Sequence, residues 1–169
     1  MLTNSQGSTA NKNGKIFEQI MVPLFQNHGF AVVTEADIKN DPLIIAGFNR
    51  YVIHNASFTT IYNQIGRTEY VIVDGAAGPN IRKVRVEAKW QQSKGSVDEK
   101  YPYMLLNGIY QYPEHEIIFV VDGNGYKPGA RQWLKDKIDN NWLDYKNTVH
   151  KDIKLMTIAE FLTWFNNEF

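Results

Sequence analysis

The chain has 169 residues, of which 43% are hydrophobic and 21% charged, as in an ordinary globular protein of one domain. It contains no cysteine, which excludes disulfide bonds and thiolate metal sites and fits a reducing compartment. Eighteen basic side chains balance eighteen acidic ones. Dedicated nucleic-acid binders are usually basic as a whole, so any surface of that kind must be local here.

The sequence shows no signal for a membrane. No apolar run approaches the ~18 residues that span a bilayer. The N-terminal residues MLTNSQGSTANKNGK have neither an apolar centre nor a cleavage site. We therefore expect a cytoplasmic protein with no membrane partner.

The chain begins with a polar stretch and a helix. Residues 1–12 are rich in Asn, Ser, Thr and Gly, and we expect them to be flexible. Pro23 should kink or split the helix that follows. The segment HGFAVV predicts a helix stop at its glycine and then a short strand. The helix itself is predicted from Lys12 onward by apolar residues at helical spacing, namely Ile16, Ile20, Met21, Leu24 and Phe25.

Residues 35–65 show no clear periodicity, and PLIIAGFNRYVIH within them fits either a strand or an irregular arm. Asn, Gln, Arg and Thr side chains are frequent in this segment, and such side chains can read the base edges of nucleic acid. The segment is therefore a candidate recognition insertion.

The rest of the chain alternates strands and helices. RTEYVIVDG and IRKVRVEAKWQ predict a hairpin around the turn AAGPN. VDEKYPYMLLNGIYQYP predicts a helix capped by Ser96, unless Pro102 sets its start one turn later. We expect an α/β fold, a mixed sheet flanked by helices, in one domain over residues 1–169. The remaining predicted elements are a buried strand (116–123), a helix (129–143), a short strand (152–157) and a closing helix that starts at Thr157.

The hairpin places charged residues opposite each other. If it turns around Gly78, Glu69 and Glu87 face each other on antiparallel strands, with Cβ atoms ~4.5–5.5 Å apart. Two carboxylates so close would repel, and a divalent cation such as Mg²⁺ would remove the repulsion. Lys89 shares their face and could hold a water molecule or balance the charge of a phosphate. A shift of one residue in the register would break this pairing.

Other patterns compete with this pair. Asp74 is an alternative first acid, but the same register places it near Arg82, ~17 Å along the strand from Glu87, too far to share an ion. Acid-x-Lys also occurs elsewhere in the chain, for example at Asp37, Asp98 and Asp152, where solvated surface charges are the simpler interpretation. The four histidines lack the spacing of metal ligands, and the chain lacks the GxSxG of a serine hydrolase.

The segments RTEYVIVDG, VRVEAKWQQ and GSVDEKYPYMLLN, in this order after a helix that carries Glu18, resemble the PD-(D/E)XK nuclease superfamily. The resemblance covers about residues 12–140. It is to the restriction-endonuclease-like branch, in which a Gln follows the Lys by two. It implies an αβββαβ core and hydrolysis of phosphodiester bonds that depends on Mg²⁺, with Mn²⁺ as a substitute.

The resemblance also implies roles for individual residues. Glu69 and Glu87 stand at the two metal-binding acids, and Lys89 stands at the catalytic lysine. Gln91 matches an accessory amide, and Glu18 matches an acid that some members direct from the first helix toward the metal. Position 69 holds Glu where the family has Asp, and no Pro precedes it, so the metal geometry must differ.

Four basic residues near this site are candidate contacts for DNA phosphates: Lys94, Lys100, Lys127 and Arg131. The last two lie in or after DGNGYKPGA, whose Gly-x-Gly lacks the spacing of a dinucleotide-binding or P-loop motif. That segment predicts a flexible turn before a helix, although its amides could also bind a phosphate.

We expect a metal-dependent DNA endonuclease of the restriction type, acting as a homodimer because cleavage of two strands needs two active sites. Two alternatives stay open. One is a structure-selective nuclease, such as a junction resolvase or a repair or phage nuclease. The other is a catalytically inactive nucleic-acid-binding module of the same fold. The aligned acids argue against the inactive module, because a decayed site has no reason to retain carboxylates that repel each other.

Overall fold

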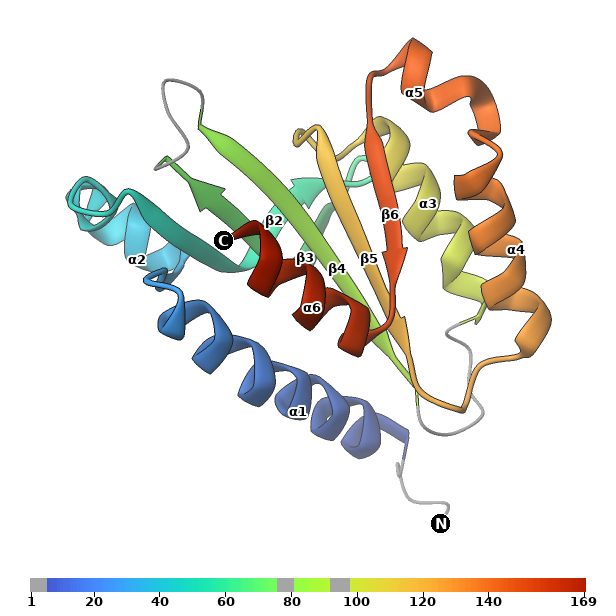
Figure 1. Cartoon of the computed structure of the whole chain (residues 1–169), viewed down its shortest axis with the longest axis horizontal. Helices are drawn as coiled ribbons and strands as arrows, with labels where there is room; N and C mark the ends of the chain where they lie inside the picture. Colours follow the sequence, from blue (N-terminus) through green and yellow to red (C-terminus); the bar gives the residue numbers. More distant parts are fainter. Residues whose placement is uncertain (1–5, 76–80, 92–97) are drawn as a thin grey trace.

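Within the residues that the structure describes, six strands form one mixed sheet with helices on both faces (Figure 1). The computed structural model describes residues 6–75, 81–91 and 98–169. β2, β3 and β4 form an antiparallel meander, whereas the pairs β1–β2, β4–β5 and β5–β6 are parallel. The strands lie in chain order across the sheet: β1 (Ala31–Thr34), β2 (Arg50–Thr59), β3 (Ile65–Asp74), β4 (Arg82–Trp90), β5 (Glu116–Asp122) and β6 (Asp152–Met156).

The helices divide between the two faces of the sheet. On one face, Phe25 of α1 and Phe165 of α6 pack with Tyr70 of β3 in an aromatic core. On the other face, Leu105 of α3 and Leu134 of α4 pack with buried residues of β5. This three-layer arrangement confirms the predicted α/β fold class. The α-helices are α1 (Gln6–Asn27), α2 (Glu35–Asn40), α3 (Tyr101–Tyr110), α4 (Pro128–Asp139), α5 (Tyr145–Thr148) and α6 (Ile158–Glu168), with 3₁₀ turns η1 (Pro42–Ile45), η2 (Asp98–Lys100) and η3 (Trp142–Asp144).

None of the described helices is both long enough and apolar enough to cross a bilayer.

Helix α1 differs from its prediction in two ways. It begins at Gln6 rather than Lys12, so that residues 6–12, expected to be flexible, belong to the helix, while residues 1–5 lie outside the described part. Pro23 does not split it. Pro23 and Gln19, whose carbonyl loses its helical partner, are both exposed. Water can therefore bind the free carbonyl, and the helix continues.

Residues 35–65 contribute a central strand. They form α2, which begins with a capping box of Thr34 and Asp37, then η1 and the ten-residue strand β2. β2 pairs with β1 on one side and β3 on the other. It is therefore β2, and not the strand at 31–34, that opens the three-strand meander of the core. The reading of bases by this segment stays a prediction.

The later elements follow the sequence closely. α3 begins at Tyr101 with Pro102 in its first turn, which is the later of the two predicted starts, while Ser96 lies outside the described residues. The predicted helix 129–143 ends at Asp139, and a turn with positive φ at Asn141 separates it from η3 and α5. α6 begins after Thr157 with a capping box, as predicted from Thr157.

A buried ion pair ties β4 to the loop before β5. The Arg85 side chain is 4% exposed and donates to both carboxylate oxygens of Glu114, with 3.1 Å between Nη2 and Oε1. Its Nη1 also donates to Thr68 Oγ1 at 2.9 Å. The Phe58 and Tyr112 rings lie 5.8 and 5.2 Å from the guanidinium. The charge is thus enclosed and fully paired, which a buried guanidinium requires.

We predict that Glu114→Ala lowers the free energy of unfolding by about 3–5 kcal/mol, because it leaves Arg85 buried without its counter-charge. Urea unfolding would measure the loss. The matched control is Asp139→Ala, which removes the partner of Lys135 from an exposed ion pair and should change stability by no more than about 0.5 kcal/mol. Equal losses in the two variants would contradict the role assigned to the buried pair.

Candidate active site

The sheet opens into a fork between β3 and β4. Their pairing runs from Asp74↔Arg82 to Tyr70↔Val86, which is the register that the sequence predicts for Glu69 and Glu87. Beyond that rung, β4 stays paired with β5 as far as Trp90, and β3 stays paired with β2 as far as Ile65. The two acids therefore stand at the point where their strands separate, one residue past the last paired rung.

Glu69 binds across the fork instead of forming the next rung. Its Oε2 accepts a hydrogen bond of 2.6 Å from the Ala88 amide of β4. On its other side, the pairs His54↔Tyr70 and Ala56↔Thr68 enclose Asn55, which has a φ of 59°. Asparagine tolerates this left-handed conformation better than most residues. The carboxylate is thus fixed by a backbone N–H of the facing strand.

Lys89 lies between the two acids. Its ammonium forms an ion pair with Glu87 Oε1, lies 3.9 Å from Glu69 Oε1, and donates to the Ala88 carbonyl at 3.1 Å. The three side chains share the sheet face that α3 and α4 cover, because they alternate with Tyr70, Val86 and Ala88, which enter the core under α1. The structure therefore brings together three of the five residues assigned from the sequence.

Burial and charge act against each other at this site. Burial raises the pKa of Glu87 to about 7; the Lys89 ammonium opposes this rise, and the Glu69 carboxylate adds to it. For Lys89, burial lowers the pKa, but the carboxylates of Glu87 and Glu69 outweigh burial and hold the pKa above its ordinary value. Lys89 is therefore a fixed cation near neutral pH, and it is Glu87 that can change its charge.

The donor atoms at the fork suit a divalent cation. Glu87 Oε2 is buried and has no hydrogen-bond partner, whereas Glu69 and the Ala88 carbonyl supply further oxygen donors nearby. Carboxylate and carbonyl oxygens are the ligands that Mg²⁺ prefers. The fork supplies two acids, Glu69 and Glu87. Within residues 6–75, 81–91 and 98–169, no group of three or more His, Cys, Asp or Glu could hold a metal. Any cation here would keep several water ligands, as Mg²⁺ usually does.

Gln91 follows the strand end and turns toward the loop after β5. Its Nε2 donates to the Gly125 carbonyl at 3.1 Å, and its own carbonyl accepts from the Gly125 amide at 2.9 Å. Gly123 has a φ of 103°, and a Cβ there would lie 2.1 Å from the Gln91 carbonyl oxygen, so the close approach requires glycine. The side-chain Oε1 of Gln91 is buried without a partner. Its catalytic role stays a prediction.

Glu18 lies on α1, which covers the opposite face of the sheet from Lys89. It is half-exposed and stands 3.9 Å from His54 Nδ1, whose ring stacks on Tyr70. In the described part of the chain it has no hydrogen bond or ion pair with Glu69, Glu87 or Lys89. The structure therefore leaves its predicted role toward the metal as a prediction.

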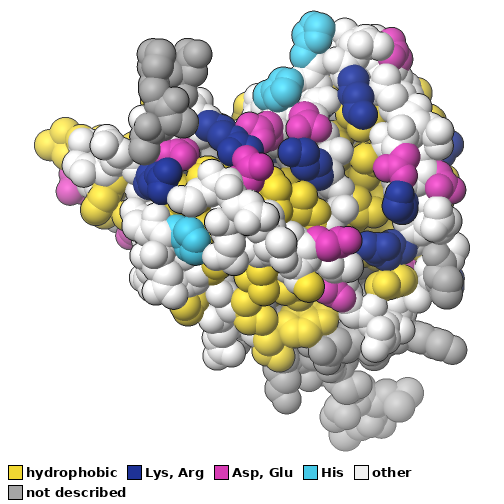
Figure 2. All heavy atoms as spheres, viewed as in Figure 1, with side chains coloured by type: hydrophobic (Ala, Val, Ile, Leu, Met, Phe, Trp, Pro, Cys, Tyr) yellow, Lys and Arg dark blue, Asp and Glu magenta, His cyan; other side chains and the backbone are white. Residues whose placement is uncertain are grey.

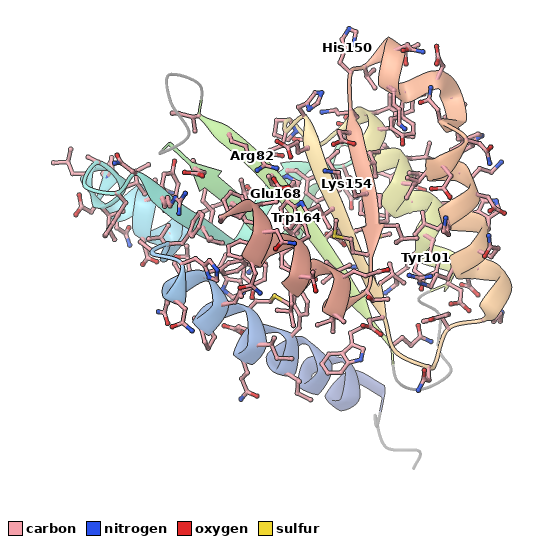
Figure 3. All side chains as sticks on the ribbon, in the orientation of Figure 1. Arg82, Tyr101, His150, Lys154, Trp164 and Glu168 are labelled. Carbon is pink, nitrogen blue, oxygen red and sulfur yellow. The ribbon has the colours of Figure 1, made fainter. Side chains whose placement is uncertain are left out.

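The other end of the hairpin is an ion network. Asp74 pairs opposite Arg82, as the register predicts, and its carboxylate accepts from Arg50 at 3.1 Å. Arg82 binds Glu116 at 2.6 Å and Glu168 at 2.8 Å, beside the Trp164 ring (Figure 3). These contacts join β2, β3, β4, β5 and α6, and so give Asp74 a structural setting away from the fork.

The candidate phosphate contacts gather at two helix ends. Lys100 and Lys127 are the exposed N-cap residues of α3 and α4, and Arg131 lies in the first turn of α4. Lys94 lies outside the described residues. On the face shown in Figure 2, Lys and Arg side chains alternate with Asp and Glu instead of forming a basic stripe. Basic and acidic side chains are thus mixed on that face, as expected for a chain with equal numbers of the two.

We predict that stability in a chelating buffer depends on pH through Glu87. Its unfolded pKa is 4.5 and its folded pKa is about 7, so between these values the unfolded state has lost a proton that the folded state keeps. Stability therefore falls as pH rises through this window. Relative to Glu87→Gln, the wild type should lose on the order of 2–3 kcal/mol between pH 4.5 and 8.

Urea unfolding of both proteins at several pH values measures this difference. Comparing the two at each pH cancels the titration of all other groups. A constant difference across the window would show that Glu87 has an ordinary pKa.

Comparison with known proteins agrees with the fold. A family model described as a PD-(D/E)XK nuclease superfamily domain matches residues 9–169. No curated protein and no solved structure matches the chain. The family match covers nearly the whole chain and confirms the resemblance seen in the sequence. Nucleases of this kind act on nucleic acid and typically use divalent metals. The chain therefore belongs to the PD-(D/E)XK nuclease superfamily.

Proposed function

We propose that this nuclease is a metal-dependent DNA endonuclease of the restriction type, which uses Mg²⁺ and accepts Mn²⁺ in its place. The observation that carries the proposal is the Lys89 ammonium between Glu69 and Glu87 at the strand fork. One of these acids has a buried oxygen without a partner. The Gln two residues after the lysine supports the restriction-type assignment, because this spacing is a feature of that branch.

The residues at the fork fit hydrolysis of a phosphodiester bond. A divalent cation held by Glu69 and Glu87 would polarise the phosphate and lower the pKa of a water molecule. Lys89 stays protonated, since its pKa is raised. Its charge stabilises the negative charge that develops on the phosphate oxygens as water attacks phosphorus and the bond to the leaving oxygen breaks. Lys89 thus acts as a cation and not as a base.

The proposal includes a homodimer, because cleavage of both DNA strands needs two such sites. Lys100, Lys127 and Arg131 are its proposed phosphate contacts. Gln91 and Glu18 are proposed to position water or metal. Each of these assignments is independent of the proposed active site at Glu69, Glu87 and Lys89, which stands even if one of them is wrong.

We predict that the wild type nicks or linearises supercoiled plasmid in the presence of Mg²⁺. Glu87→Ala and Lys89→Ala should each lower the rate by about 100-fold or more, as expected for the loss of a group that stabilises the transition state. Lys83→Ala is the matched control, because Lys83 is an exposed residue of the same strand and should leave the rate unchanged. Gel electrophoresis of the products measures all four proteins.

The outcome of the plasmid experiment decides between positions of the active site and between the three candidate functions. Equal rates in all four proteins would place the active site elsewhere. Cleavage of branched DNA alone would replace the restriction type by a structure-selective nuclease. No cleavage of plasmid or branched DNA with Mg²⁺ or Mn²⁺ would leave an inactive binding module of the same fold.

We also predict that Mg²⁺ binds at the fork in the absence of DNA. A ligand that binds only the folded state raises the melting temperature, by an amount equivalent to about 2.7 kcal/mol at 100 times Kd. The shift should appear in the wild type and be lost in Glu69→Gln and Glu87→Gln. Glu18→Gln decides whether Glu18 takes part, and Asp136→Asn on the exposed side of α4 is the control. An equal shift in all of these proteins would contradict a metal site at the fork.

A further inference from the structure

The hairpin of β2 and β3 continues beyond the fork as an arm, residues 55–69. In this arm β3 pairs with β2 as far as the rung Thr59↔Ile65, and in the described part of the chain it has no pairing there with β4. Ile65 precedes Glu69 by four residues, which is about 13 Å along a strand. The tip of the arm, residues 60–65, is therefore within reach of a nucleic-acid strand that lies on the fork.

A buried asparagine ties the tip to α3, which covers the sheet face of the charged residues at the fork (Figure 1). Asn107 is 1% exposed. Its Oδ1 accepts from the Ile61 amide at 2.9 Å, and its Nδ2 donates to the Tyr103 carbonyl at 2.9 Å. The Thr60 amide closes the turn by donating to the Gln64 carbonyl at 2.8 Å. Hydrogen bonds thus fix the position of the tip against α3.

The tip presents a tyrosine ring that is stacked on one side and open on the other. The ring centres of Tyr62 and Tyr103 lie 5.3 Å apart, with an angle of 22° between the ring planes. Tyr62 is nevertheless 70% exposed, because its opposite ring face has no such neighbour in the described part of the chain. A ring that is already ordered in this way loses little entropy when a flat ligand stacks on it.

The side chains around this ring are polar or apolar but carry no charge. Residues 60–65 contain no Asp, Glu, Lys, Arg or His. Asn63 and Gln64 are exposed, and no hydrogen bond within the described residues holds their side-chain amides. The lack of charge argues against a phosphate contact at the tip. Aromatic rings stack on bases, and free amides pair with base edges.

A protein partner fits this tip less well than a nucleobase does. Of the large hydrophobic side chains that are exposed in the described part of the chain, the arm carries two, Tyr62 and Ile65. A stable protein interface buries about 800 Å² on each partner around an apolar centre. One open ring face with free amides beside it matches a nucleobase in size and in chemistry.

We propose that Tyr62 is a stacking platform for one base of the cleaved DNA strand, with Asn63 and Gln64 beside the edge of that base. The proposal deepens the proposed nuclease function and rests on it. A base inside a duplex has both faces covered by its neighbours, so the platform takes a base that lies outside the duplex stack. A structure-selective enzyme would find such a base unpaired, and a restriction-type enzyme would flip it out.

DNA binding in a chelating buffer tests the platform, because a metal-dependent nuclease then binds the strand without cleaving it. The probe is a short duplex with a single-stranded extension. Tyr62→Leu keeps an apolar side chain but removes the ring, and should raise Kd roughly tenfold. Tyr62→Phe keeps the ring and should bind as the wild type does. Equal Kd values for Tyr62→Leu and the wild type would overturn the platform.

The control is Tyr110→Ala. Tyr110 is 52% exposed at the end of α3 and stacks on no ring in the described part of the chain. Its loss should leave Kd unchanged. A rise in Kd equal to that of Tyr62→Leu would show that any exposed tyrosine has this effect, and would overturn the assignment to Tyr62.

The salt dependence separates stacking from a charge contact. Tyr62→Leu should leave the slope of log Kd against log salt unchanged, because no phosphate contact is lost. A fall of the slope by about 0.9, the value for one phosphate contact, would overturn the base assignment. A ring with a merely structural role would lower the melting temperature of Tyr62→Leu and leave its Kd unchanged.

A fluorescent base locates the contact. 2-Aminopurine, whose fluorescence falls when its ring stacks, replaces one base of the extension at a time. Binding to the wild type should quench it most at one position, about four base steps or more from the phosphate that is cleaved when Mg²⁺ is added. Tyr62→Phe should keep this quenching and Tyr62→Leu should lose it. Equal quenching in Tyr62→Leu at every position would overturn the platform.

The two proposals fail in different ways. If the wild type cleaves DNA while Tyr62→Leu changes neither Kd nor the quenching, the platform is wrong and the nuclease stands. If the wild type does not cleave DNA but binding and quenching still depend on Tyr62, the platform stands as a DNA-binding site and the proposed activity is wrong.

Discussion

The separation of β3 from β4 after the pair Tyr70↔Val86 is the constraint on which the site depends. A sheet that continued its ladder would hold Glu69 and Glu87 side by side at a repulsive distance. Here the strands part, and the Ala88 amide that faces the gap donates to Glu69. The opening also leaves room for Lys89 between the acids. One interruption of strand pairing thus converts an unfavourable cross-strand pair into a cluster of two acids and one lysine.

The rest of the fold holds this opening in place. β4 cannot move toward β3 or away from it freely, because its pairing with β5 continues through Trp90. The buried Arg85–Glu114 pair fixes the same strand two residues before Glu87. On the opposite face, the rings of Phe25 and Phe165 lie 5.2 Å apart and close the aromatic core under Tyr70. Rigid elements on both sides position the polar residues, as a preorganised site needs.

The electrostatics of the site explain how a neutral chain can handle nucleic acid. The chain has as many basic as acidic residues, and charges of both signs meet around Lys89. Acids at the fork favour a cation, and the Lys89 ammonium beside them favours an anion. A phosphodiester bound with a metal ion presents both charges at once. Complementarity is therefore achieved by local arrangement and not by net charge.

The sequence by itself determined the hairpin of β3 and β4, its register, and the shared face of Glu69, Glu87 and Lys89. Alternation along strands and the turn composition are local properties, so they can be inferred without the fold. It also favoured Glu69 over Asp74 at the fork, and the register places Asp74 opposite Arg82. It did not reveal β2, because polar residues and a left-handed Asn55 interrupt its alternation.

Only the tertiary structure decided where the sheet opens, since the separation of β3 and β4 depends on the competing pairs with β2 and β5. It turned Gln91 toward Gly125 and placed Glu18 beside His54 on the opposite face. It also brought Arg85 and Glu114, which are 29 positions apart in the chain, together in a buried ion pair. Contacts between residues so distant in sequence depend on how helices pack on the sheet, and no local pattern encodes that packing.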